Sequence, residues 1–351
     1  MQHRLIAAAR KLNTSDNWNR LAIVLSVLVI AFAMAVLVHQ LRDVSPARVY
    51  TAFKAIPTHN IVAACLLVVA AYVTLTFYDW FALRTIGKTH VPYRMAAFAA
   101  FSSYSIGHNI GATVFTGNAI RFRLYASYGL TIVDIAKLAF VTGLTFWLGN
   151  AVVLGLGISY EPEAASAINQ LPVWLNRALA IFVLAVIAAY VFWIGRKTRL
   201  VGRDNWQVTL PGARLTLVQI GIGILDLGIS ALAMYMLLPA SADSDFVAIL
   251  VTFIFATLLG FASHAPGGLG VFDAAMLVAL PQFDKEALLA SLLLFRLIYY
   301  ICPFTLALML VGGRELWKTL AAPAVASEPP APKTRVAAQR VKGKGRKSPR
   351  P

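Results

Sequence analysis

The amino-acid sequence predicts an all-α polytopic membrane protein, and three observations support this class. The 351-residue chain is 59% hydrophobic and only 13% charged, whereas an average soluble domain is about 25% charged. It contains six apolar runs of about 18 residues or more, each of which could cross a hydrocarbon core of about 30 Å as a helix. Lys and Arg gather in a few of the segments between the runs. A soluble protein with six buried core helices is a poor alternative.

The first apolar run is interpreted as a retained signal anchor. It follows Arg4, Arg10, Lys11 and Arg20, as the apolar part of a signal peptide would. It is longer than the usual stretch of about 7–15 residues, and no small-residue cleavage site follows. The predicted full spans are 21–38, 61–78, 132–157, 178–194, 215–238 and 287–312.

Two further regions, 95–125 and 247–281, are apolar but interrupted by Gly, Pro, His or Asn. Gly and Pro end helices, and irregular backbone at membrane depth occurs only where it is buried in protein or lines a watery cavity. Both regions are therefore predicted to be re-entrant hairpins. Single kinked spans and pairs of full crossings are the alternatives.

The distribution of Lys and Arg favours hairpins, because these residues concentrate on the cytoplasmic side. With two hairpins and a cytoplasmic N-terminus, 24 of these residues lie inside and 5 outside. With one simple span per region, the split is 18 inside and 11 outside. Arg42, Arg48 and Lys54 nevertheless fall in a predicted outer segment. The inner segments are 1–20, 79–94, 117–131, 195–214 and 313–351, and the outer ones are 39–60, 158–177, 239–246 and 282–286.

This topology divides the chain into a basic cytoplasmic N-terminus, 1–20, a membrane domain, 21–312, and a tail, 313–351. The membrane domain has two halves, 21–157 and 178–312, with the same order of span, span, hairpin and span. Three crossings per half make the second half inverted, and broken helices in inverted repeats are typical of transporters. No clear residue-level repeat accompanies this order. The predicted location is a bacterial inner (plasma) membrane, with both termini cytoplasmic.

The tail is predicted to be disordered. It carries eight basic residues and no acid between Lys333 and Arg350, interleaved with Pro, Gly and Ala, so it cannot form a packed core. A polybasic tail beside a membrane is attracted to anionic lipids. We therefore expect phospholipids rather than nucleic acid as its partners.

Two charged residues lie deep within predicted spans, Asp226 and Arg296. A charge at the bilayer centre costs about 2.5–3.5 kcal/mol on insertion scales, so it usually finds a partner and marks a pathway. One hypothesis is that the two residues pair with each other. The other is that Arg296 receives a lipid phosphate, which its guanidinium fork suits.

Other charges lie near the predicted cytoplasmic surface. Asp79 and Arg84 follow the second run, and Arg121 and Arg123 follow the first broken region. These arginines could contact lipid phosphates or simply anchor the helices by snorkelling. Asp134 and Lys137, spaced three apart, are expected to neutralise one another.

The two helix breaks contain His108 and His264. No Cys or carboxylate cluster accompanies either residue, so a hydrogen bond at a helix end is preferred to metal binding, and no metal or cofactor is predicted. The APGGLG segment, 265–270, is expected to leave N–H groups free at the start of a helix, which would bind an anion. Cys65 and Cys302 lie in apolar spans and are interpreted as small hydrophobic residues.

Several motifs, in order, make residues 15–315 resemble the transmembrane, flippase-like region of lysylphosphatidylglycerol synthases, or multiple peptide resistance factors, and their stand-alone relatives. They are YDWFALR (78–84), SIGHNIGATVFTGNAIRFRLYASYGL (105–130), LTFWLG (144–149), LDLGISALAMYMLLP (225–239), SHAPGGLGVFD (263–273) and FRLIYYICPF (295–304). Asp273 departs from the more usual Glu of the family but keeps the carboxylate.

The resemblance implies a phospholipid flippase, connected in the family with resistance to antimicrobial peptides. The expected substrate is an anionic or aminoacylated phosphatidylglycerol-type lipid. A soluble aminoacyltransferase domain is not expected after residue 312, so the chain is not expected to be an enzyme by itself. The alternative is a membrane subunit or scaffold for a separate lipid-modifying enzyme. A homodimer is one open oligomeric state, and the headgroup and energy source also stay open.

The candidate lipid-binding residues combine the membrane charges with the polar and glycine residues of these motifs. They are Asp79, Arg84, Asn109, Thr116, Arg121, Arg123, Asp226, His264, Gly267, Gly268, Asp273 and Arg296.

Overall fold

The computed structural model describes residues 39, 42, 44–111, 113–197, 199–203, 206–239 and 245–321. The predicted first span, 21–38, the N-terminus, 1–20, and the tail beyond residue 321 lie outside these residues. The chain divides into two compact units, 1–310 and 311–351. The candidate site lies in the first unit.

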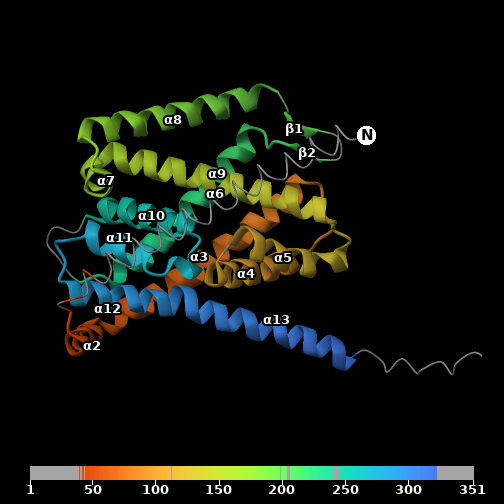
Figure 1. Ribbon diagram of the computed structural model, residues 1–351. Coiled ribbons are helices and arrows are strands. Elements are labelled where there is room, and N and C mark those ends of the chain that lie inside the picture. Colours follow the sequence, from red (N-terminus) through yellow and green to blue (C-terminus); the bar gives the residue numbers. More distant parts are fainter. Residues whose placement is uncertain are drawn as a thin grey trace, which may run out of the picture. The chain divides into compact units, whose positions relative to one another are not determined.

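Helices dominate the described part of the chain (Figure 1). Those up to residue 169 are α2 (Pro46–Ala55), α3 (Thr58–Thr85), α4 (Tyr93–Ile110), α5 (Thr113–Tyr125), α6 (Ile132–Tyr160) and α7 (Pro162–Asn169). Those after it are α8 (Val173–Arg196), α9 (Ala213–Leu237), α10 (Phe246–Ser263), α11 (Val271–Ala279), α12 (Lys285–Phe295) and α13 (Cys302–Ala321). Short turns η1 (Ala126–Tyr128) and η2 (Pro266–Gly268) and a π-helical segment, η3 (Arg296–Ile301), complete the helical elements.

Six helical stretches in the described residues are long and apolar enough to cross a membrane, and the chain is a multi-pass helical membrane protein. Five of them contain the predicted spans 61–78, 132–157, 178–194, 215–238 and 287–312 to within a residue. They are Thr58–Thr85, Ile132–Tyr160, Val173–Arg196, Ala213–Leu237 and Lys285–Trp317. The sixth, Phe246–Ser263, forms the first part of the second broken region.

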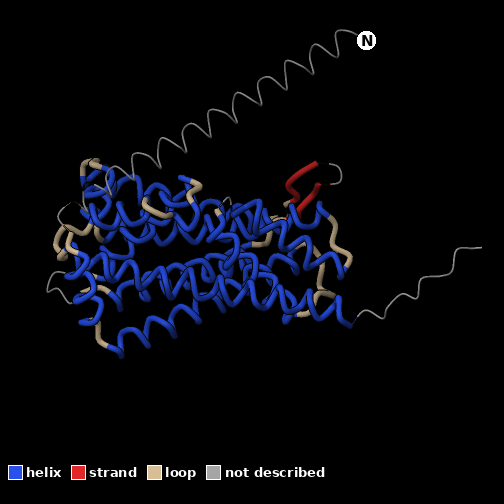
Figure 2. The backbone as a smooth tube through the Cα atoms, turned by 60° about the horizontal axis from the view of Figure 1, so that its bottom comes forward, coloured by secondary structure: helices blue, strands red, loops and turns tan. Residues whose placement is uncertain are grey.

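The segments between the spans contain structure that the apolar pattern did not predict. Helices α2 and α7 lie within the predicted outer segments 39–60 and 158–177. Strands β1 (Leu200–Arg203) and β2 (Trp206–Thr209) form an antiparallel hairpin with Leu200 opposite Thr209. Figure 2 shows this hairpin at one end of the helices.

Helix α9 packs against both α3 and α6 at the centre of the unit. The closest approach joins Gly149 of α6 to Gly223 of α9, where a Cβ atom on either glycine would lie 2.6 Å from the Cα of the other. Small residues allow this proximity between membrane helices. About one turn along, Gln219 donates a hydrogen bond to the Thr145 hydroxyl at 2.9 Å.

The first broken region forms a helical hairpin. Helix α4 ends at Ile110, and the next residue, Gly111, has φ +85°, a conformation that only glycine adopts without strain. Helix α5 packs back against α4. Lys88, before α4, forms an ion pair of 2.9 Å with Asp134, after α5. The two ends of this region therefore lie close together, as they would in a hairpin, and re-entrance into the membrane stays a prediction.

The same ion pair corrects the expectation for Asp134. Its carboxylate contacts Lys88 and also accepts hydrogen bonds from the backbone N–H and hydroxyl of Thr131, in a capping box that begins α6. Asp134 thus pairs with a residue across the hairpin rather than with Lys137 one turn away. Sequence spacing cannot show such a partner, because the whole hairpin separates the two residues.

The second broken region also returns on itself. Helix α11 packs against α10, and Phe246 at the start of α10 packs on Tyr235 with ring centroids 5.5 Å apart. Ser291, in the middle of α12, donates to the Leu237 carbonyl at 2.6 Å, so the end of α9 contacts both the start of α10 and α12. Re-entrance itself stays a prediction. It is favoured by the lengths of α5 and α11, which have 13 and 9 residues, because a full crossing needs roughly 20 residues.

Candidate functional site

The two helix breaks contact each other. A Cβ atom on Gly111, in the first break, would lie 3.1 Å from the carbonyl oxygen of His264 in the second. The Asn109 amide donates to the Ser105 carbonyl at 2.8 Å and to the Tyr300 carbonyl at 3.1 Å. The first break is therefore held against both the second break and the π-helical segment η3.

Arg296 forms a buried ion pair with Asp273, on the α11 side of the second break. Its Nε and Nη2 donate to the two carboxylate oxygens at 2.8 and 2.6 Å. Nη1 donates to the Gly267 carbonyl at 2.9 Å, and Nη2 approaches the Gly268 carbonyl at 3.4 Å. Both residues are about nine-tenths buried, so the pair has little access to solvent.

The APGGLG segment differs from the expected anion site. The N–H groups of Gly268 and Leu269 donate to carbonyls within the same segment, and the Gly270 N–H donates to Asp273 at 3.1 Å. The start of α11 therefore already binds an anion, its own Asp273, as negative groups at helix N-termini do. Gly267 and Gly268 have φ of +58° and +61°, and their carbonyls face Arg296.

The hypothesis that Asp226 pairs with Arg296 is wrong. Asp226 is buried, and its Oδ2 accepts a hydrogen bond from the Tyr78 hydroxyl at 3.1 Å. Its Oδ1 has no hydrogen-bond partner among the described residues. The partner of Arg296 is Asp273, which lies on α11. The two residues are 23 positions apart in the sequence, and they meet because the chain between them turns back from α11 into α12.

A second buried ion pair, in the first half of the domain, joins α5 to α3. Arg121 of α5 donates from Nε and Nη2 to Asp79 of α3 at 2.8–3.1 Å. Tyr125 also donates to Asp79, at 2.9 Å, and the guanidinium lies over the Tyr104 ring, 4.7 Å from its centroid. The predicted interfacial residues Asp79 and Arg121 are thus in the interior and contact each other.

Two tyrosines connect this pair to Asp226. Tyr78 donates to Asp226 and contacts Tyr104 edge to face, with centroids 6.1 Å apart, and Tyr104 lies against Arg121. Sequence reasoning assigned no role to either tyrosine. The available signal is weak: a Tyr in an apolar helix usually finds a polar partner for its hydroxyl when buried, but the sequence does not identify that partner.

The remaining candidates are placed differently. Arg84 and Arg123 are exposed, and Arg84 lies over the Trp80 ring, 4.3 Å from its centroid. Thr116 donates to the Gly111 carbonyl at 3.2 Å and so closes the first break. His264 is exposed at the end of α10, with Nδ1 3.0 Å from the Ala262 carbonyl. The described residues contain no cluster of three or more His, Cys, Asp or Glu that could hold a metal ion.

The fold and this site define a class: a multi-pass helical membrane protein in which two helix–break–helix segments meet and two Arg–Asp pairs are buried. The chain belongs to the family described as the lysylphosphatidylglycerol synthase transmembrane region, whose model matches residues 21–307.

The relatives differ in how much of their own length this chain matches. The chain is 30% identical over 269 residues to an uncharacterized protein of Synechocystis sp., with coverage of 76% of this chain and 83% of that protein. It is 27% identical over 267 residues to the inner membrane protein YbhN of Escherichia coli, covering 73% and 81%. It is also 24% identical over 317 residues to the phosphatidylglycerol lysyltransferase of Staphylococcus haemolyticus, but this covers only 35% of that protein.

Proposed function

We propose that this protein moves a phospholipid, of the anionic or aminoacylated phosphatidylglycerol type, between the leaflets of a bacterial inner membrane. The observation that carries the proposal is the burial of two Arg–Asp pairs, one of which contacts the second of two helix breaks that meet each other. Buried charges in membrane helices are costly and are usually functional. Broken helices that meet are typical of transporter binding sites.

The chemistry of the pairs suits a lipid headgroup. A guanidinium that binds a carboxylate through two N–H groups, as Arg296 and Arg121 do, binds a phosphate in the same way. An aminoacylated headgroup also carries an ammonium, which could bind the released Asp273 or Asp79. Exchange of partners would keep each charge paired, whereas an unpaired buried charge costs about 3–5 kcal/mol.

The relatives support a lipid substrate and this location. A relative named phosphatidylglycerol lysyltransferase has a phosphatidylglycerol lipid in its name, and the E. coli relative is named an inner membrane protein. The excess of Lys and Arg in segments 79–94, 117–131 and 195–214 supports a cytoplasmic position for these loops and for both termini.

The test is leaflet exchange in liposomes. The purified protein is reconstituted with fluorescent phosphatidylglycerol, an aminoacylated derivative or a zwitterionic lipid, and a membrane-impermeant quencher reports exchange. We expect faster exchange of the first two lipids than in empty liposomes. Arg296→Ala and Asp226→Ala should abolish this exchange, and Arg296→Lys should reduce it strongly, because Lys keeps the charge but loses the planar fork.

The matched control is Arg48→Gln. Arg48 is exposed and pairs with the buried Glu286 at 2.9 Å, and Gln can still donate a hydrogen bond to that carboxylate, so exchange should be unchanged. Correct folding of each variant is checked by its elution as a single species in detergent. Exchange at the rate of empty liposomes for every headgroup would refute the translocator proposal.

The second candidate is a membrane subunit or scaffold for a separate lipid-modifying enzyme. It is favoured by the staphylococcal relative, where the matching region forms only about a third of a protein named as a lysyltransferase. This candidate predicts no leaflet exchange but recovery of a soluble aminoacyltransferase with the tagged protein from membranes. Recovery of lipid exchange without such an enzyme would contradict it.

A further inference from the structure

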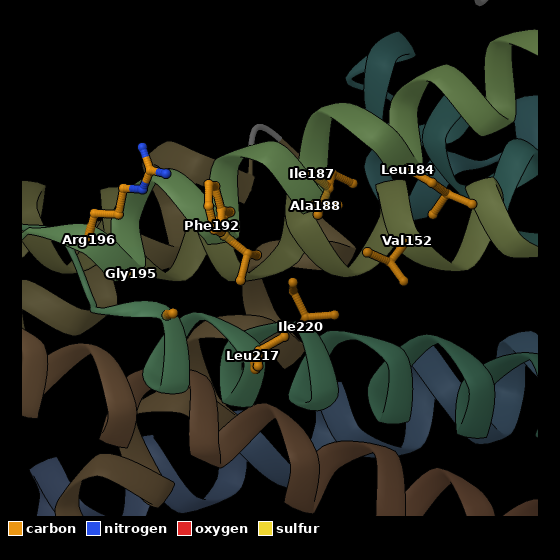
Figure 3. A pocket seen from close by; sticks show the side chains of 11 residues that line it. Val152, Leu184, Ile187, Ala188, Phe192, Gly195, Arg196, Leu217 and Ile220 are labelled. Atoms are coloured by element: carbon orange, nitrogen blue, oxygen red, sulfur yellow. The ribbon is translucent and has the colours of Figure 1, made fainter.

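Helices α6, α8 and α9 line an open apolar groove that is separate from the buried ion pairs. Its volume is about 710 Å³, within the range of roughly 300–1,000 Å³ found for small-molecule sites. The lining includes Val152 of α6, Leu184, Ala188 and Phe192 of α8, and Leu217 and Ile220 of α9. Figure 3 shows these side chains along the space between the helices. Asp226 lies on α9 but does not line the groove.

The groove exists because α8 approaches its neighbours closely only at separate points. A Cβ atom on Gly155 of α6 would lie 2.7 Å from the Leu184 side chain, and one on Gly195 would lie 3.1 Å from the Ala213 Cβ. Between these contacts, most of α8 is exposed, and Asn176, Ala180 and Ile194 are its only buried residues. All three helices are candidate membrane spans, so the groove lies within the membrane-spanning part of the chain.

One end of the groove is positively charged. Arg196 lines it, beyond Phe192 and far from Leu184 in Figure 3. Its guanidinium lies over the Phe192 ring, 4.3 Å from the centroid, and contacts no carboxylate among the described residues. Nearby in the chain, Arg199 has a buried Nε without a hydrogen-bond partner in the described residues. Segment 195–214 contains five Lys and Arg and a single acid, Asp204.

We propose that this groove binds an acyl chain of an anionic phospholipid, with the lipid phosphate at Arg196. An apolar channel that ends at a guanidinium without a carboxylate partner in the described residues matches a molecule with a hydrocarbon chain and a phosphate. The predicted first span, 21–38, contains no acidic residue to pair with Arg196, and the segment before it, 1–20, carries four Lys and Arg against one acid, Asp16. The site goes beyond the proposed translocation, since it concerns binding at the outer surface of α9.

The test uses phosphatidylglycerol with a photoreactive group on one acyl chain, in liposomes that contain the full-length protein. After irradiation, mass spectrometry identifies the labelled residues. We expect labelling on the groove-facing residues of α8 and on 217–220, competed by unlabelled phosphatidylglycerol but not by phosphatidylcholine. Arg196→Gln should lower the preference for the anionic lipid by roughly fivefold or more, because a charge-assisted contact is lost.

Ala188→Trp and Ala189→Trp form a matched pair. Both positions are exposed on α8, but only Ala188 lines the groove, so only Ala188→Trp should abolish groove labelling. Equal labelling of all faces of α8, or labelling with no headgroup preference, would overturn the proposal. The readout is binding, so it can succeed where the leaflet-exchange assay fails, and the two proposals are tested separately.

Discussion

At the scale of single residues, a buried ion pair differs from an exposed charge. Arg121 and Asp79 are almost completely buried, whereas in the Arg48–Glu286 pair only the Glu286 side chain is buried and the Arg48 side chain is 67% exposed. Exposed pairs typically contribute less than about 1 kcal/mol. Removing one member of a buried pair is far more costly, because the other charge is left without water or a partner.

Asp79→Leu should therefore lower the free energy of unfolding by about 3–5 kcal/mol. The double variant Asp79→Leu/Arg121→Met should recover most of that loss, since apolar residues can replace a buried pair at little cost. Denaturant unfolding in detergent micelles measures both. Arg177→Met, at an exposed position of α8, is the control, with a change below about 1 kcal/mol. A double variant that is less stable than Asp79→Leu would contradict this account of the pair.

At the scale of elements, glycine positions decide how the helices pack and where they break. Gly149 and Gly223 bring α6 and α9 into contact, whereas a Cβ atom added to Gly143 of α6 or Gly221 of α9 would meet nothing within 4 Å among the described residues. The same residue type thus has a packing role at two positions and none at two others on the same helices.

Gly149→Ala and Gly223→Ala should each destabilise the domain by about 1–3 kcal/mol, because an added methyl group overpacks the contact. Gly143→Ala and Gly221→Ala should be neutral or slightly stabilising, since Ala favours a helix by roughly 1 kcal/mol over Gly. Thermal unfolding of the four variants in detergent measures the difference. Equal effects at all four positions would show that helix propensity, rather than the α6–α9 contact, determines the result.

The helix breaks and the π-helical segment had unequal sequence signals. Gly111, Pro266, Gly267 and Gly268 indicated both breaks, because few other residues adopt those backbone conformations. Nothing in RLIYYI, 296–301, predicted η3. Single π-helical turns often occur at functional sites, and this one begins at Arg296, whose guanidinium reaches the second break.

At the scale of the whole membrane domain, the topology can be tested by the accessibility of single cysteines. In a background without Cys65 and Cys302, cysteines at Glu163, Thr89 and Gln207, all exposed, report three loops. Thr89 and Gln207 should react from the cytoplasmic side and Glu163 from the other, because hairpins return the chain without a net crossing. Impermeant maleimide added to intact cells and to inverted vesicles distinguishes the sides. Reaction of Glu163 and Gln207 from one side would refute the inverted topology.

The sequence by itself determined the membrane class, five of the six candidate spans in the described residues and the places where two helices break. These depend on local properties: the length of an apolar run and the backbone freedom of Gly and Pro. Only the tertiary structure decided which charges are paired. Arg296 binds Asp273 rather than Asp226, Arg121 binds Asp79, and Asp134 binds Lys88. The physical reason is that an ion pair depends on distance in space, and two returning hairpins bring together residues that the sequence keeps far apart.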